Sequence, residues 1–229
     1  ARRRTQGRVP FIFDLAHAQR LITVAAALPD NARTPQRGMT YATAFALLYG
    51  LGLRVGELTR LTRADVDLER RLLVIRETKF GKSRVVPFGP RLALRLADYM
   101  SAREGASEGD RHGPLAPAAP VFSFLAGRAI HPGTLSQTFL HLVRALAFER
   151  PDGVARPRLH DLRHSFAVGT LLRWYQTGAN PAAHLLQLST FLGHVDPAST
   201  AVYLTMTPEL LQQAGARFEH YANGEDRHA

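Results

Sequence analysis

RLHDLRHSFA at residues 158–167 and LSTFLGHVDPASTAVYL at residues 188–204 are the two most specific segments of this 229-residue chain. They bring four chemically versatile side chains into one short run: His160, Arg163, His194 and Tyr203. His160 and Arg163 are three residues apart, so on a helix they would lie on one face and could meet the same anion. Alone, such a pair would more simply be a solvated helix face.

Two upstream segments add to this set. GLRVGEL at residues 52–58 supplies Arg54, and TKFGKSR at residues 78–84 supplies Lys79. Guanidinium groups bind phosphate oxygens in bidentate fashion, and a tyrosine hydroxyl can act as a nucleophile. The combined set therefore favours chemistry on a phosphodiester.

The composition agrees with a polyanionic partner. Lys and Arg number 29 against 19 Asp and Glu, giving a net charge of +10, and nucleic acid is the first candidate partner. Charge alone would also fit a generally basic soluble protein. With no cysteine, disulfides, a thiolate nucleophile and a cysteine zinc site are excluded. No apolar run approaches the ~20 residues of a membrane span and no signal peptide is visible, so we expect a cytoplasmic protein.

The use of lysine is unusual. Of the 29 basic residues only Lys79 and Lys82 are lysines, and they lie three apart. A lysine can give up its proton whereas a guanidinium stays charged, so a general acid would have to be a lysine rather than an arginine. Chance placement in a turn explains the same observation equally well.

Apolar periodicity and turn residues predict a mainly α (α+β) fold with one small antiparallel β-hairpin. The expected strands are residues 72–76 and 83–87, with Lys79 at the tip of the hairpin or on its first strand. Residues 104–120 read as a loop. The expected helices are residues 13–28, 40–51, 55–60, 91–103, 134–148, 160–175, 181–191, 197–203 and 208–222.

Each site residue also has a simpler interpretation. Tyr203 lies in an apolar helix and could be a packing residue. Glu57 could hold the Arg54 guanidinium in place or form an ordinary surface ion pair. The spacing of His160 and His164 matches a zinc helix, but Asp161 stands at the general-base position and no third ligand follows at the usual spacing. We therefore expect His164 to be a buried, hydrogen-bonded histidine.

The ordered pattern Arg, Lys, His-x-x-Arg, His, Tyr resembles the catalytic domain of the tyrosine recombinase (phage integrase) family, in its Xer-like form. The boxes LLYGLGLRVGELTRL, HDLRHSFA and FLGH are similar to those of the family. The resemblance implies a catalytic domain over residues 11–206, preceded by a basic arm or linker at 1–10 and followed by a C-terminal helix and tail at 207–229. The N-terminal DNA-clamp domain of the family is missing from this chain, and residues 173–184 look longer than the family pattern.

The resemblance also implies a site-specific recombinase that acts without ATP, metal or cofactor through a 3′-phosphotyrosine. Tyr203 would attack the phosphate, His160 would take its proton, Arg54 and Arg163 would bind the phosphate oxygens, His194 would add a hydrogen bond and Lys79 would protonate the leaving 5′-oxygen. Glu57 and His164 would support them. The expected DNA contacts are Lys82, Arg84, Arg2, Arg3 and Arg4.

The expected partner is double-stranded DNA. We also expect self-association into a synaptic tetramer on it, with the C-terminal helix a candidate contact, and a monomer without DNA. Two alternatives remain open: a type IB topoisomerase, with similar chemistry but no synapsis, and a catalytically inactive DNA-binding relative.

Overall fold

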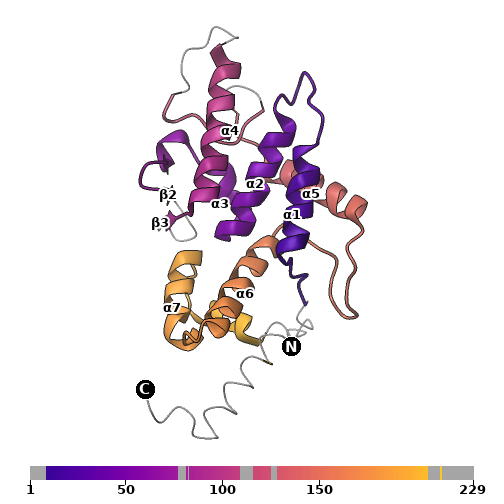
Figure 1. Cartoon of the computed structure of the whole chain (residues 1–229). Coiled ribbons are helices and arrows are strands. Elements are labelled where there is room, and N and C mark those ends of the chain that lie inside the picture. Colours follow the sequence, from indigo (N-terminus) through magenta and orange to yellow (C-terminus); the bar gives the residue numbers. More distant parts are fainter. Residues whose placement is uncertain are drawn as a thin grey trace, which may run out of the picture.

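The chain folds into packed helices with one small antiparallel sheet, as the sequence predicts (Figure 1). The computed structural model describes residues 9–76, 81, 83–108, 116–124, 128–205 and 212. Its elements are α1 (Leu15–Ala26), α2 (Arg37–Leu51), α3 (Val55–Arg60), the 3-10 turn η1 (Arg63–Asp65), β1 (Val66–Asp67), β2 (Leu72–Ile75), β3 (Arg84–Pro87), α4 (Pro90–Glu108), α5 (Pro132–Leu146), α6 (Asp161–Gln176), α7 (Pro181–Leu192), α8 (Ala198–Ala201) and the 3-10 turn η2 (Val202–Thr205).

Helix α2 is the centre of the fold. It is apolar around almost its whole circumference and packs against α1, α4 and α6, the behaviour expected of a helix without a polar face. Gly52 ends it in the left-handed conformation (φ 58°), and a Cβ there would lie 2.6 Å from Phe166 and 2.9 Å from Leu192. Glycine thus serves both as the helix stop and as the close contact that brings α6 and α7 to the end of α2.

The predicted hairpin is present and belongs to a three-stranded sheet. β2 pairs with β3 in antiparallel register, with Leu73 opposite Val86, and β1 pairs with the other edge of β2. Leu73, Ile75 and Val86 face the core. The sequence did not indicate β1, because two residues carry no alternating pattern. The turn residues Lys79 and Lys82 lie outside the described residues.

Two predicted elements were wrong in extent. The helix expected over residues 197–203 is the short α8 followed by the 3-10 turn η2, which carries Tyr203. The loop expected from residue 104 begins later, because α4 continues to Glu108. Tertiary contacts explain the extra turn: Glu104 pairs with Arg63, and the Ala102 carbonyl accepts a hydrogen bond from Gln36. Local propensity does not reveal such long-range partners.

The apolar core has two parts. The larger part contains residues from each of the helices α1, α2, α3, α4 and α5 and from the sheet. The smaller consists of Ala167, Val168, Leu171, Leu188, Leu192 and Tyr203, and corresponds to the orange and yellow tier of α6 and α7 in Figure 1. Asn180 caps the start of α7, since its side chain accepts a hydrogen bond from the Ala182 N–H. The basic arm at Arg2, Arg3 and Arg4 and the predicted helix at 208–222 fall outside the described residues, apart from residue 212. Within the described helices none is both long and apolar enough to cross a membrane.

Candidate active site

Glu57 joins two arginines from different elements. Arg54, the residue before α3, donates from Nη1 to Oε1 of Glu57 at 2.8 Å and from its backbone N–H to Oε2 at 2.9 Å. Arg84, the first residue of β3, donates from Nη1 and Nη2 to the same two oxygens at 2.9 Å each. The expected contact between Glu57 and Arg54 is thus present, and a second guanidinium shares the carboxylate.

The Glu57 side chain is only 2% exposed. Burial acts to raise its pKa, but the hydrogen bonds and charges of Arg84 and Arg54 outweigh it and lower the pKa to about 2. Glu57 is therefore ionised at neutral pH and holds both guanidinium groups in fixed orientations.

Replacing Glu57 with glutamine is expected to lower the free energy of unfolding at pH 7 by about 3 kcal/mol. The native pKa lies below the ordinary value of 4.5, so this stabilisation is full above that value and is lost as the pH falls toward 2. Denaturant unfolding of both proteins over this pH range measures the effect. Glu69→Gln, at an exposed turn position, is the control and should change stability by less than about 0.5 kcal/mol. A difference that does not shrink on acidification would contradict the assignment.

Arg163 is buried, with 2% exposure, and two backbone carbonyls accept hydrogen bonds from its guanidinium group. Its Nη1 donates to the carbonyl of Gly52 and its Nη2 to that of Leu192, both at 2.7 Å. These carbonyls stand at the C-terminal ends of α2 and α7, where the helix dipole is negative. Burial, followed by the charge of Arg54, lowers the Arg163 pKa to about 10, so the group stays charged at neutral pH.

The end of α7 orients all three arginines. Arg84 donates from Nε to the Phe191 carbonyl at 2.8 Å, Arg163 binds that of Leu192, and Arg54 donates from Nη2 to that of Gly193 at 2.9 Å. Gly193 caps α7 with φ 69°, and a Cβ there would come within 2.7 Å of Arg84. Three cations thus gather around one carboxylate, and the excess positive charge suits an anionic ligand.

Tyr203 belongs to the smaller core and to this site at once. Its residue is 4% exposed, which fits the packing interpretation, but its hydroxyl lies 3.0 Å from Nδ1 of His164. Burial raises the pKa of the Tyr203 hydroxyl, partly offset by the charge of Arg163 and a hydrogen bond from it. The hydroxyl is therefore held between a histidine and an arginine.

The two other predicted histidines border the tyrosine. The His194 ring stacks on that of Tyr203, with centroids 6.3 Å apart, and its Nδ1 lies 2.7 Å from Oγ1 of Thr200. The His160 ring meets that of His164 edge to face at 4.8 Å. Burial lowers the pKa of both His160 and His194 to about 4, with the nearby histidine and arginine charges acting in the same direction. Both rings are therefore neutral at pH 7. His160 is an exposed residue at the edge of the site, although neighbouring protein atoms remove enough water from its ring to lower the pKa.

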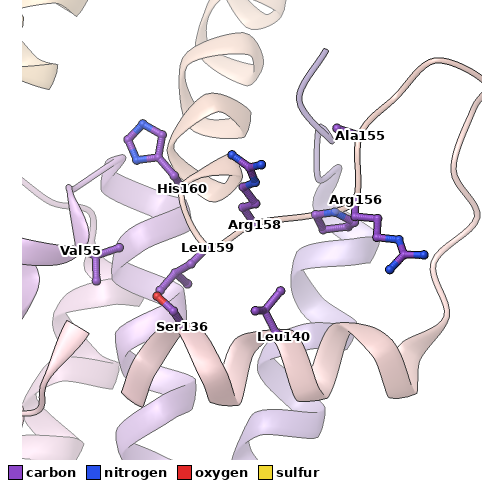
Figure 2. Close-up of a pocket in the computed structure, with 9 residues that line it drawn as sticks. Val55, Ser136, Leu140, Ala155, Arg156, Arg158, Leu159 and His160 are labelled. Carbon is purple, nitrogen blue, oxygen red and sulfur yellow. The ribbon is translucent and has the colours of Figure 1, made fainter. Parts of the chain in front are cut away.

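A hollow of about 560 Å³ opens beside His160. Figure 2 shows the segment before α6 running over α5, with His160 and Arg158 on it and Leu140 and Ser136 on the helix below. Arg156 and Arg158 are both exposed here. The hollow thus places two exposed arginines near His160.

The structure brings Arg54, His160, Arg163, His194 and Tyr203 into one site, while Lys79 lies outside the described residues. Two placements differ from expectation. Arg84, expected to contact DNA, has a side chain 10% exposed and bound to Glu57, so this geometry favours an internal role. His164, expected to be buried, is half-buried and contacts the Tyr203 hydroxyl. In the described residues no group of three or more His, Asp or Glu could hold a metal ion.

Comparison with known proteins decides the family. Residues 18–209 match the model of the phage integrase family. The chain belongs to this family. Its fold agrees with the crystal structure of XerH site-specific recombinase bound to palindromic difH substrate, at a TM-score of 0.65, 18% identity, and coverage of 94% of this chain and 56% of XerH.

Relatives within the phage integrase family are closer in sequence. Protein y4rB of Sinorhizobium fredii, which carries the provisional name of an integrase/recombinase, is 39% identical over 212 residues, 92% of this chain and 66% of y4rB. Tyrosine recombinase XerA of Thermococcus onnurineus is 33% identical over 171 residues, 74% of this chain and 52% of XerA. The chain thus spans between about half and two thirds of these relatives.

Proposed function

We propose that this chain is the catalytic part of a site-specific DNA recombinase that cuts and rejoins strands through a phosphotyrosine. The observation that carries the proposal is the Tyr203 hydroxyl, held beside Arg163 within a cluster of three arginines and one carboxylate. The names of the relatives, integrase and recombinase, do not favour the topoisomerase alternative.

In the proposed reaction, Oη of Tyr203 attacks the scissile phosphorus and loses its proton to a neighbouring base. The new bond joins Oη to phosphorus, and the bond from phosphorus to the 5′-oxygen breaks. Arg54 and Arg163 bind the non-bridging oxygens, where charge builds in the transition state. A guanidinium has five N–H donors. The contacts of Arg54 and Arg163 within the protein use only some of these donors, and the others are available to phosphate. The leaving 5′-oxygen takes a proton from Lys79, the role that the family resemblance implies.

The test is covalent trapping. A pool of nicked duplexes with randomised cores, in which the short cleaved end diffuses away, is incubated with the protein and then denatured. We expect a protein–DNA adduct, with the nucleotide on the peptide that contains Tyr203. Attachment to another residue, or binding without any adduct, would refute the mechanism; the latter would favour the inactive DNA-binding relative.

We propose that the hollow beside His160 accepts the DNA backbone next to the cleaved phosphate. Arg158→Ala is expected to weaken binding to any duplex and to reduce the slope of log K against log[salt] by about 1. Fluorescence anisotropy over a salt series measures this. Arg33→Ala is the control. Arg33 is exposed and precedes the N-terminal end of α2, whereas Gly52 lies at the C-terminal end of that helix. An unchanged slope for Arg158→Ala would place the DNA elsewhere.

The synaptic state is a further proposal: a monomer without DNA and a tetramer on paired sites, with the C-terminal segment as a candidate contact. Light scattering of the protein with and without the DNA recovered by trapping tests it. A stable tetramer without DNA would contradict the proposed monomeric free state. A complex that holds one protein molecule at every protein concentration would contradict the proposed tetramer on DNA.

A further inference from the structure

His164 lies directly against the reactive atom of the proposed mechanism. We propose that His164, rather than His160, orients the Tyr203 hydroxyl and accepts its proton. This assignment rests on the proposed function, because it concerns the same reaction.

The geometry separates the three histidines around Tyr203. His164 Nδ1 lies 3.0 Å from Oη, the distance of a hydrogen bond. His160 contacts the ring of His164 instead. His194 faces the tyrosine ring rather than its hydroxyl, and its Nδ1 is bonded to Thr200. Among the described histidines, His164 thus places a ring nitrogen within hydrogen-bond distance of the Tyr203 hydroxyl.

Chain packing fixes this contact. His164 lies on α6, four residues before Val168 and one turn from Ala167, which belong to the smaller core together with Tyr203. Helix α6 packs directly on η2, the turn that carries the tyrosine. The same core therefore sets the positions of both partners, and the hydrogen bond needs no ligand to form.

The electrostatic surroundings indicate when the proton would move. The neutral rings of His160 and His194 border this region, and two cations face it: the Arg163 guanidinium on α6 and the Arg54 guanidinium before α3. A positive imidazolium at His164 is unfavourable beside these cations in the free protein. A bound phosphodiester brings negative charge against the same cations. Proton transfer is then easier with DNA in place than without it.

The step balances in both directions. During cleavage the Oη–H bond breaks, the proton passes to Nδ1 of His164, and Oη forms its bond to phosphorus. During rejoining an incoming 5′-oxygen displaces Oη, and the imidazolium returns the proton to it. His164 ends each cycle neutral.

His164→Asn tests the assignment, because asparagine retains a hydrogen-bonding group near the Nδ1 position but cannot accept the proton. We expect covalent attachment to slow by about 100-fold or more. Incorporating a ring-fluorinated, more acidic tyrosine at position 203 should then restore much of the rate in His164→Asn and change the wild-type rate far less. A residue that only packs against Tyr203 would show no such selective rescue.

The matched control is His184→Asn on α7. His184 makes a hydrogen bond of the same length, 3.0 Å from Nδ1 to Gln187, on the protein surface, and its loss should leave attachment unchanged. Thermal unfolding of all variants checks that they are folded. If wild type forms the adduct and His164→Asn forms it equally fast, or if fluorination accelerates both proteins equally, this proposal is wrong and the proposed function stands. If wild type forms no adduct, both fall.

Discussion

Tyr203→Phe is expected to abolish the covalent protein–DNA adduct completely, while DNA binding and folding persist. The phenylalanine ring still fills the space among Leu171, Leu188 and Leu192 in the smaller core. Only the hydroxyl is lost, and with it the hydrogen bonds to His164 and from Arg163. The free energy of unfolding should fall by no more than about 1 kcal/mol. Denaturing gels of the trapped complex measure the adduct, and anisotropy measures binding.

Tyr175→Phe is the matched control. Tyr175 packs against the same core cluster from α6, so its substitution tests whether losing a hydroxyl near this core is enough to stop the reaction. It should leave the adduct intact. An adduct that survives in Tyr203→Phe would mean that another side chain is the nucleophile, whatever the family pattern implies.

The fold could be predicted largely because its signals are local. Apolar periodicity marked most helices, including the one over residues 181–191 that corresponds to α7. The boundary of α4 was misplaced because it depends on a partner far away in the sequence, Arg63 for Glu104. Strand β1 was not foreseen because its two residues carry no alternating pattern. Propensity is a weak guide wherever tertiary contacts set the outcome.

The site could be predicted only in part, for a similar reason. The order of Arg54, His160, Arg163, His194 and Tyr203 is visible in the sequence, but what orients them is not. Backbone carbonyls at the end of α7 have no sequence signature, and they receive three guanidinium groups.

Two weak signals for the missed contacts were nonetheless present. Glu57 is the one carboxylate in the segment GLRVGEL, in a chain with an excess of arginine. This excess is a weak indication that Glu57 has a second arginine partner, such as Arg84. His164 is four residues after His160, hence on the same helix face, and could have been weighed beside it as the base for Tyr203.

Arg163→Lys is expected to have the second largest effect on the reaction. Lysine keeps the positive charge, but its single ammonium cannot reproduce the planar fork that meets Gly52, Leu192 and the tyrosine. We expect the rate of covalent attachment to fall by about 100- to 1,000-fold, the usual effect of losing one preorganised donor to a developing negative charge. Single-turnover rates on trapped DNA, under saturating protein, measure it apart from binding.

The same substitution should also destabilise the fold, which allows its two roles to be separated. One buried carbonyl at the end of α2 or α7 loses its donor, at a cost of about 2 kcal/mol. Arg173→Lys, exposed near the end of the same helix, should change stability by less than about 0.5 kcal/mol and leave the rate unaltered. Because Arg163→Lys must be compared as folded protein, rates are taken well below its unfolding temperature. A folded Arg163→Lys protein that attaches at the wild-type rate would show that Arg163 joins α2 to α7 but does not stabilise the transition state, leaving Arg54 as the principal phosphate ligand.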